Sequence, residues 1–343
     1  MDKHAHLWLE EMIENHKKNK LQNASNGLTL PLKSDGKNYE LEDLKGDQRD
    51  IACVIMEHLK GWLSGDRKPL HMTISGVAGT GKTVLIHTLV TAIRRMFGHD
   101  DSVHVVSPTG ASANNAGGTT FHRAGAVRVN NVDKEMTAGQ RQNLVASFRR
   151  TVAVIGDERS LLQSSVLGAF ERNVASTAHG GGHSREAFGG IPLVVLIGDD
   201  GQLPPVESGA FDAISGKFTA SKLNTCKTRG DMLFQQLSDT VMSLTNLKRQ
   251  DDNDTELVDL LTSLREDRVT DTQATEILEK LHLDNFTKEQ QKEIIHSDRT
   301  MHLFATREPM ETHNLDCLHR DSCKTNPVAL IKTLVSEQCK TFF

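Results

Sequence analysis

The chain has 343 residues, of which 37% are hydrophobic and 25% are charged, and its formal net charge is −5. This length can hold two domains of ordinary size, each with a hydrophobic core of its own. The negative charge balance excludes a protein that binds polyanions through bulk positive charge, so any binding of nucleic acid must depend on local grooves and stacking.

Two further features bound the class of protein. No window is apolar for long enough to span a membrane and no signal peptide is recognised, so we expect no membrane partner. The five cysteines are scattered and form no C-x-x-C pair. This usage is typical of reduced thiols in an intracellular protein.

The predicted elements fall into three segments along the chain. Residues 1–43 are polar, and we expect them to form a poorly ordered extension. Residues 44–243 contain strand-like apolar runs that alternate with helical stripes; the runs lie at 72–74, 103–106, 152–155 and 193–197. This alternation predicts an α/β domain with a parallel sheet flanked by helices. Residues 244–343 carry helical stripes and a strand-like run at 301–305, which predict a second, incomplete domain.

Residues 76–83 read Gly-Val-Ala-Gly-Thr-Gly-Lys-Thr, a complete phosphate-binding loop between a strand-like run and a helical stripe. Its glycines let backbone N–H groups turn inward, and the next helix directs its positive end at the same anion. Lys82 would reach the β- and γ-phosphates, and the Thr83 hydroxyl would hold Mg²⁺. A chance Gly-rich turn is the alternative, but the flanking strand and helix favour a nucleoside triphosphate site. The predicted nucleotide-binding residues of this loop are Gly76, Gly79, Thr80, Gly81, Lys82 and Thr83.

Polar residues follow two later strands. Asp157 and Glu158 end the run at 152–155, and such a pair provides one carboxylate for Mg²⁺ and one that orients or deprotonates an attacking water. Gln202 follows the run at 193–197 and precedes a Leu-Pro-Pro turn, where its amide could contact the γ-phosphate. Because ligands of open α/β sheets bind at the carboxyl ends of the strands, these segments should converge. Two surface acids are the alternative for the pair. Hydrolysis is favoured over a small-molecule kinase, which needs an acceptor pocket.

Taken in order, these motifs resemble those of the Pif-one family of superfamily-one-B DNA helicases, relatives of the RecD-type enzymes. The matching segments are residues 44–48, 76–83, 107–122, 157–160, 188–206, 244–250 and 305–314. The resemblance implies a RecA-like P-loop NTPase domain followed by a partial second RecA-like domain. It also implies ATP and Mg²⁺ as ligands and single-stranded DNA and its junctions with duplex as partners.

The resemblance assigns roles residue by residue. Gln48 would contact the adenine, Thr83 and Asp157 would hold Mg²⁺, and Arg249 would be an arginine finger at the γ-phosphoryl group. The catalytic residues would be Lys82, Asp157, Glu158, Gln202 and Arg249. The single-stranded DNA path would be lined by Pro108, Thr109, Gly110, Thr120 and His122.

Some positions depart from the family pattern. Gly156 and Arg159 flank the two acids where the family has aliphatic residues, and Asp200 stands where the family has an aromatic residue. The family's later motifs do not follow the segment near residue 316, so we expect either a fragment or truncated gene product, or a motor that has lost its second half. The expected function is an ATP-dependent 5′-to-3′ DNA helicase of repair, recombination and telomere maintenance, located in the nucleus or mitochondrion. The alternative is a nucleotide-gated DNA-binding module without helicase activity.

Overall fold

The computed structural model describes residues 28–176, 186–205, 225–246, 255–266, 268–297 and 300–321. The chain divides into two compact units, residues 1–265 and residues 266–343. Arg249, the predicted arginine finger, lies outside the described residues.

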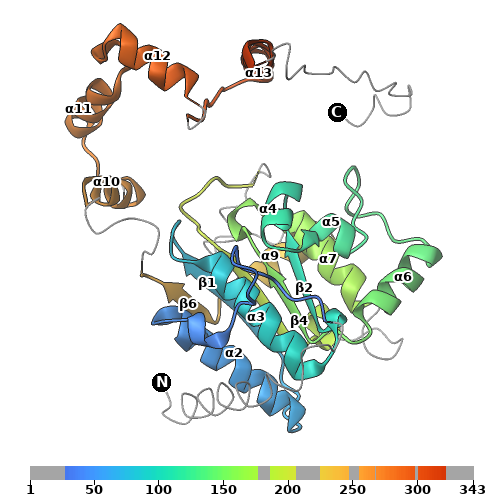
Figure 1. Cartoon of the computed structure of the whole chain (residues 1–343). Helices are drawn as coiled ribbons and strands as arrows, with labels where there is room; N and C mark the ends of the chain where they lie inside the picture. Colours follow the sequence, from blue (N-terminus) through green and yellow to red (C-terminus); the bar gives the residue numbers. More distant parts are fainter. Residues whose placement is uncertain are drawn as a thin grey trace. The chain divides into compact units, whose positions relative to one another are not determined.

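The first unit is built on a six-stranded sheet with the order β3-β2-β4-β5-β1-β6 (Figure 1). Its strands are β1 (Leu70–Gly76), β2 (Val103–Ser107), β3 (Thr119–Thr120), β4 (Ala153–Gly156), β5 (Leu193–Gly198) and β6 (Val241–Leu244). Every neighbouring pair is parallel. The predicted α/β fold with a parallel sheet is thereby confirmed.

Helices cover both faces of this sheet (Figure 1). Among its described residues, the α-helices of the first unit are α2 (Asp47–Leu63), α3 (Lys82–Phe97), α4 (Gly110–Asn115), α5 (Phe121–Ala124), α6 (Ala138–Phe148), α7 (Ser164–Ala175), α9 (Cys226–Leu237) and α10 (Thr255–Arg265). Its 3₁₀ turns are η1 (Leu41–Asp43), η2 (Asp100–Ser102), η3 (Arg159–Leu161) and η4 (Ala187–Gly190).

The hydrophobic core has two layers, one on each face of the sheet. Side chains of α2 and α3 pack with Val195 and Ile197 of β5 on one face. Side chains of α5, α6, α7 and α9 pack with Val194 and Leu196 on the other. Successive strand residues point to opposite faces, and both faces are covered by helices, so every residue of β5 is buried. This explains why the sequence of β5 is a continuous apolar run.

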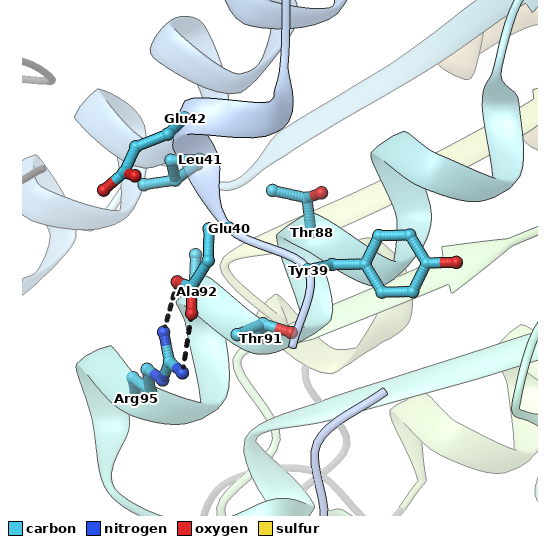
Figure 2. Close-up of a pocket in the computed structure, with 8 residues that line it drawn as sticks. All are labelled: Tyr39, Glu40, Leu41, Glu42, Thr88, Thr91, Ala92 and Arg95. Atoms are coloured by element: carbon cyan, nitrogen blue, oxygen red, sulfur yellow. Dashed lines mark hydrogen bonds and ion pairs between the residues drawn. The ribbon is translucent and has the colours of Figure 1, made fainter. Parts of the chain in front are cut away.

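Residues 28–43 belong to the stretch for which the sequence predicts poor order, yet they lie against the outer side of α3. Glu40 forms a two-pronged ion pair with Arg95 of α3, 2.6 and 3.2 Å between the paired atoms (Figure 2). Leu41 is buried in the core beside this pair. The cavity between Tyr39 and Arg95 has ≈ 10 Å³, which is room for about one water molecule. This part of the predicted extension therefore packs as part of the first unit.

The second unit contains α11 (Asp271–Leu281), η5 (Leu283–Asn285), α12 (Lys288–His296) and α13 (Arg307–Asp321). The prediction of a strand at 301–305 is wrong, because the described residues of this unit contain no strand. Met301 and Leu303 are 83% and 87% exposed. An apolar run becomes a strand only where a partner strand completes its hydrogen bonds, and the described part of this unit offers none.

Candidate nucleotide and DNA site

The sheet topology brings the predicted motifs together at one edge. β4, β5 and β1 are neighbours and run in the same direction, so their carboxyl ends lie side by side. The phosphate-binding loop follows β1, Asp157 and Glu158 follow β4, and Gln202 follows β5. Ser75, one residue before the end of β1, pairs with Gly198, the last residue of β5, and Gly156, the last residue of β4, pairs with Leu196, so the three strands end within about two residues of one another.

The phosphate-binding loop closes on itself. Gly79 and Gly81 have φ angles of 89° and 82°, a region that glycine enters without steric cost. The Thr80 hydroxyl donates to the carbonyl oxygen of Val77 at 2.9 Å. The Lys82 ammonium donates to the carbonyl oxygens of Gly76, at 2.8 Å, and Val77, at 3.2 Å. Lys82 therefore lies within the loop, at the start of the helix whose N-terminal N–H groups favour anions.

Gln48, in the first turn of α2, is hydrogen-bonded to the backbone of this loop. Its side chain is 1% exposed, and its amide nitrogen donates to the carbonyl oxygens of Thr80, at 3.2 Å, and Gly81, at 2.9 Å. The Gln48 side chain thus holds the backbone at the end of the loop. The predicted contact with adenine stays a prediction, whereas support of the loop is what the structure shows.

The two acids after β4 occupy different surroundings. Asp157 is buried; burial, together with the neighbouring Glu158 carboxylate, raises its pKa to about 6, against the opposing effects of the Glu158 N–H and the Lys82 ammonium. Glu158 has a left-handed backbone with φ 55°, and its Oε2 atom is buried without a hydrogen-bond partner among the described residues. The hydrogen bond and the positive charge near Asp157 are thus too weak to offset the effect of its burial on its pKa.

These residues fit a magnesium ion. A cation beside Asp157 would stabilise its ionised form, and the hydroxyl of Thr83, an exposed residue at the start of α3, could serve as a second oxygen ligand. No cluster of three or more His, Cys, Asp or Glu side chains suited to a metal occurs within the described ranges. Mg²⁺ does not require one, because it keeps several waters and binds one or two carboxylates plus substrate phosphates.

Gln202 is exposed on a tight turn after β5. Its backbone N–H donates to the carbonyl oxygen of Asp199 at 3.0 Å, and the Gly201 N–H donates to the Asp199 carboxylate at 3.0 Å. Arg265, the last residue of α10, pairs with the same carboxylate at 2.5 Å. The turn that carries Gln202 is thus fixed through Asp199.

In the sequence, Arg159 and Asp200 are two separate departures from the family pattern. In the structure they form an ion pair, 3.1 Å from Nε to Oδ1 and 2.5 Å from Nη2 to Oδ2. Two charged residues of opposite sign, each at an unusual position in neighbouring motifs, are the signal that could have predicted this pair.

The residues predicted to line the DNA path also meet at the carboxyl edge of the sheet. Ser107, the last residue of β2, pairs with Thr120 of β3, so the segments after both strands are adjacent. Thr109 and Thr120 accept backbone N–H groups as the N-caps of α4 and α5. Pro108 and Gly110 flank the first of these caps, and Gly110 is exposed. Their contact with DNA stays a prediction.

His122, the remaining residue assigned to the DNA path, is half-buried in α5, and burial lowers its pKa. A neutral imidazole can donate from one nitrogen and accept at the other. In the predicted contact with DNA, His122 would therefore offer hydrogen bonds rather than charge.

The family model of PIF1-like helicases matches residues 43–275. The chain belongs to this family. It is 29% identical over 198 residues to the ATP-dependent DNA helicase RRM3 of Saccharomyces cerevisiae, covering 57% of this chain and 25% of that protein. It is 34% identical over 172 residues to the ATP-dependent DNA helicase PIF4 of Trypanosoma brucei brucei, covering 48% of this chain and 20% of that protein. The match therefore spans about a quarter or less of these relatives.

Solved structures share the fold. The crystal structure of Pif1 helicase from Candida albicans superposes with a TM-score of 0.57 at 23% identity, covering 87% of this chain and 59% of that one. Unliganded Pif1 from Bacteroides sp. gives a TM-score of 0.54 at 22% identity, covering 81% and 57%. The family resemblance read from the motifs is confirmed. No helix in the described ranges is both long and apolar enough to cross a membrane.

Proposed function

We propose that this chain is the ATP-hydrolysing part of a DNA helicase, which binds ATP with Mg²⁺ and turns it over in response to single-stranded DNA. The observation that supports this best is the meeting of the phosphate-binding loop, the acid pair and Gln202 at the ends of three adjacent parallel strands. Membership of the PIF1-like helicase family supports the same function.

Each residue of the site has a role in this reaction. Lys82 would exchange the carbonyl oxygens of Gly76 and Val77 for phosphate oxygens, which offer it full negative charge. Glu158, whose Oε2 atom is buried and unpartnered in the described structure, would orient the attacking water and accept its proton. Gln202 would contact the γ-phosphate. Bound Mg²⁺ supplies charge neutralisation at the phosphate oxygens, with Thr83 and Asp157 holding it.

DNA would bind beside the nucleotide, along the segments that follow β2 and β3. Short side chains and helix N-termini at Thr109, Gly110 and Thr120 allow a backbone phosphate to approach closely. By family resemblance we extend the proposal to 5′-to-3′ movement, to junctions of single-stranded and duplex DNA, and to repair, recombination and telomere maintenance in the nucleus or mitochondrion.

The test is ATP hydrolysis with and without single-stranded DNA for the wild type and for Glu158→Gln. We expect DNA to raise the wild-type rate, and we expect the variant to lose turnover by roughly a hundredfold or more while it still binds nucleotide. Glu57→Gln, the same change at an exposed position of α2, is the matched control and should leave the rate unchanged. A wild-type rate indifferent to DNA would contradict the proposal. Nucleotide-dependent DNA binding without any turnover would instead support the binding-module alternative.

A further inference from the structure

The loops that carry Glu158 and Gln202 are in direct backbone contact. A Cβ atom added to Gly198, the last residue of β5, would lie 2.7 Å from the backbone nitrogen of Arg159. Real Cβ contacts are longer than this, so only glycine lets the end of β5 pass so close to the turn after β4. One loop therefore cannot move toward the other without displacing it.

The Arg159 side chain then ties three strands together. Its Nε and Nη2 atoms donate to the two carboxylate oxygens of Asp200, after β5, and its Nη1 atom donates to the Thr73 hydroxyl of β1 at 3.1 Å. Arg159 itself follows β4. The guanidinium therefore spans the strands that hold the acid pair, Gln202 and the phosphate-binding loop.

The Arg159 partner of this ion pair is shielded from solvent, and the Asp200 partner is more exposed. The Arg159 side chain is 5% exposed and that of Asp200 is 36% exposed. A planar guanidinium that meets a carboxylate through two parallel N–H groups fixes its orientation as well as its distance. Loss of the Asp200 charge would leave a buried cation without its counter-charge, which is costly.

The pair also acts on Glu158. Arg159 follows directly after Glu158, whose left-handed φ of 55° and ψ of 51° are unfavourable for a residue with a side chain. Such a conformation persists only where the surrounding structure holds it. Arg159, the next residue, packs against Gly198 and bonds to Asp200 and Thr73.

We propose that Arg159 and Asp200 are positioning residues, whose ion pair sets the Gln202 turn relative to the Glu158 carboxylate so that both act on one terminal phosphate. This inference rests on the proposed function. It explains the two departures from the family pattern together, because a charge at either position alone would be unpaired.

The test is a double-mutant cycle of Asp200→Asn and Arg159→Lys. Each removes the two-pronged geometry, and Asp200 is exposed enough for its variant to fold. We expect each variant to lower kcat for ATP about tenfold while the Kd for ADP stays within about twofold, with no further loss in the double variant. Asp101→Asn, which alters an exposed pair with Arg150, is the matched control and should change nothing.

A second readout does not depend on hydrolysis. Backbone amide exchange at Gly201 and Gln202 should quicken by about fivefold or more in both variants, because the turn then keeps its bonds to Asp199 but loses its connection to Arg159. Additive losses of kcat, or unaltered exchange at these amides, would overturn the positioning role. If the wild type hydrolyses no ATP, the proposed function fails, and amide exchange still decides whether the pair fixes the turn.

Discussion

The crossing of α7 and α9 offers a sharp test of the packing that supports the site, since α7 and α9 cover the face of the sheet beneath β4 and β5. The two helices meet at Gly168 and Gly230. A Cβ atom added to Gly168 would overlap the carbonyl oxygen of Cys226 and lie 2.8 Å from the backbone nitrogen of Gly230, whereas ordinary contacts begin at 3.4 Å. We expect Gly168→Ala to push the two helices apart.

The magnitude follows from the atoms that would collide. Overpacking of a core costs about 1–3 kcal/mol, and the upper limit of about 3 kcal/mol applies because both neighbours are backbone atoms that cannot rotate away. For a domain of roughly this size, each kcal/mol lowers the Tm by about 2–4 °C. Gly168→Ala should therefore lower the Tm by about 6–12 °C.

Thermal unfolding followed by circular dichroism measures this shift, and Gly139→Ala is the matched control. Gly139 lies in the first turn of α6, and a Cβ atom there would meet no atom within 4 Å. Because alanine favours a helix over glycine by up to about 1 kcal/mol, this control should hold or raise the Tm. Equal shifts in the two variants would refute the argument, because they would show that the loss of glycine itself, and not the helix crossing, sets the effect.

Two further predictions concern other parts of the chain. Arg249→Ala should lower ATP turnover by about tenfold or more with little change in nucleotide Kd, because an arginine finger acts on the transition state; unchanged turnover would remove that assignment. Hydrogen bonds from the Thr245 hydroxyl and N–H lower the pKa of Asp47 from 3.8, so the stability this carboxylate contributes is present above that pH and is lost as pH falls further. Asp47→Asn should therefore lower the free energy of unfolding in urea at pH 7. The decrease of that free energy below about pH 4 should also be smaller in the variant than in the wild type; the same dependence of stability on pH in both proteins would count against this.

The central strands and the phosphate-binding loop were predictable because each is a local pattern. A strand buried on both faces must be apolar throughout, as in β5, and a loop that wraps phosphate needs glycine where φ is positive, as at Gly79 and Gly81. Parallel pairing then places the ends of the strands at one edge without further information.

Other elements depend on distant partners and leave little trace in the sequence. β6 is short, and Val241 and Ser243 are exposed, so its pattern is weak. It forms because its residues pair with β1, far away in the chain. Conversely, the apolar run at 301–305 has a strand-like composition but no partner in the described part of its unit, so composition alone was misleading there.

The contrast between Lys82 and Arg159 shows why a motif can predict chemistry yet miss its support. A residue that contacts a phosphate must carry a positive charge or a hydrogen-bond donor, so the role of the lysine in this loop can be predicted from the motif alone. A residue that only positions another must be complementary to its partner. Its residue type can therefore vary, provided that the partner varies with it. Arg159 and Asp200 lie 41 positions apart, and each departs from the family pattern in a way that only the other makes favourable. Departures of opposite charge in neighbouring strand-end motifs are therefore better tested as a pair than judged one by one.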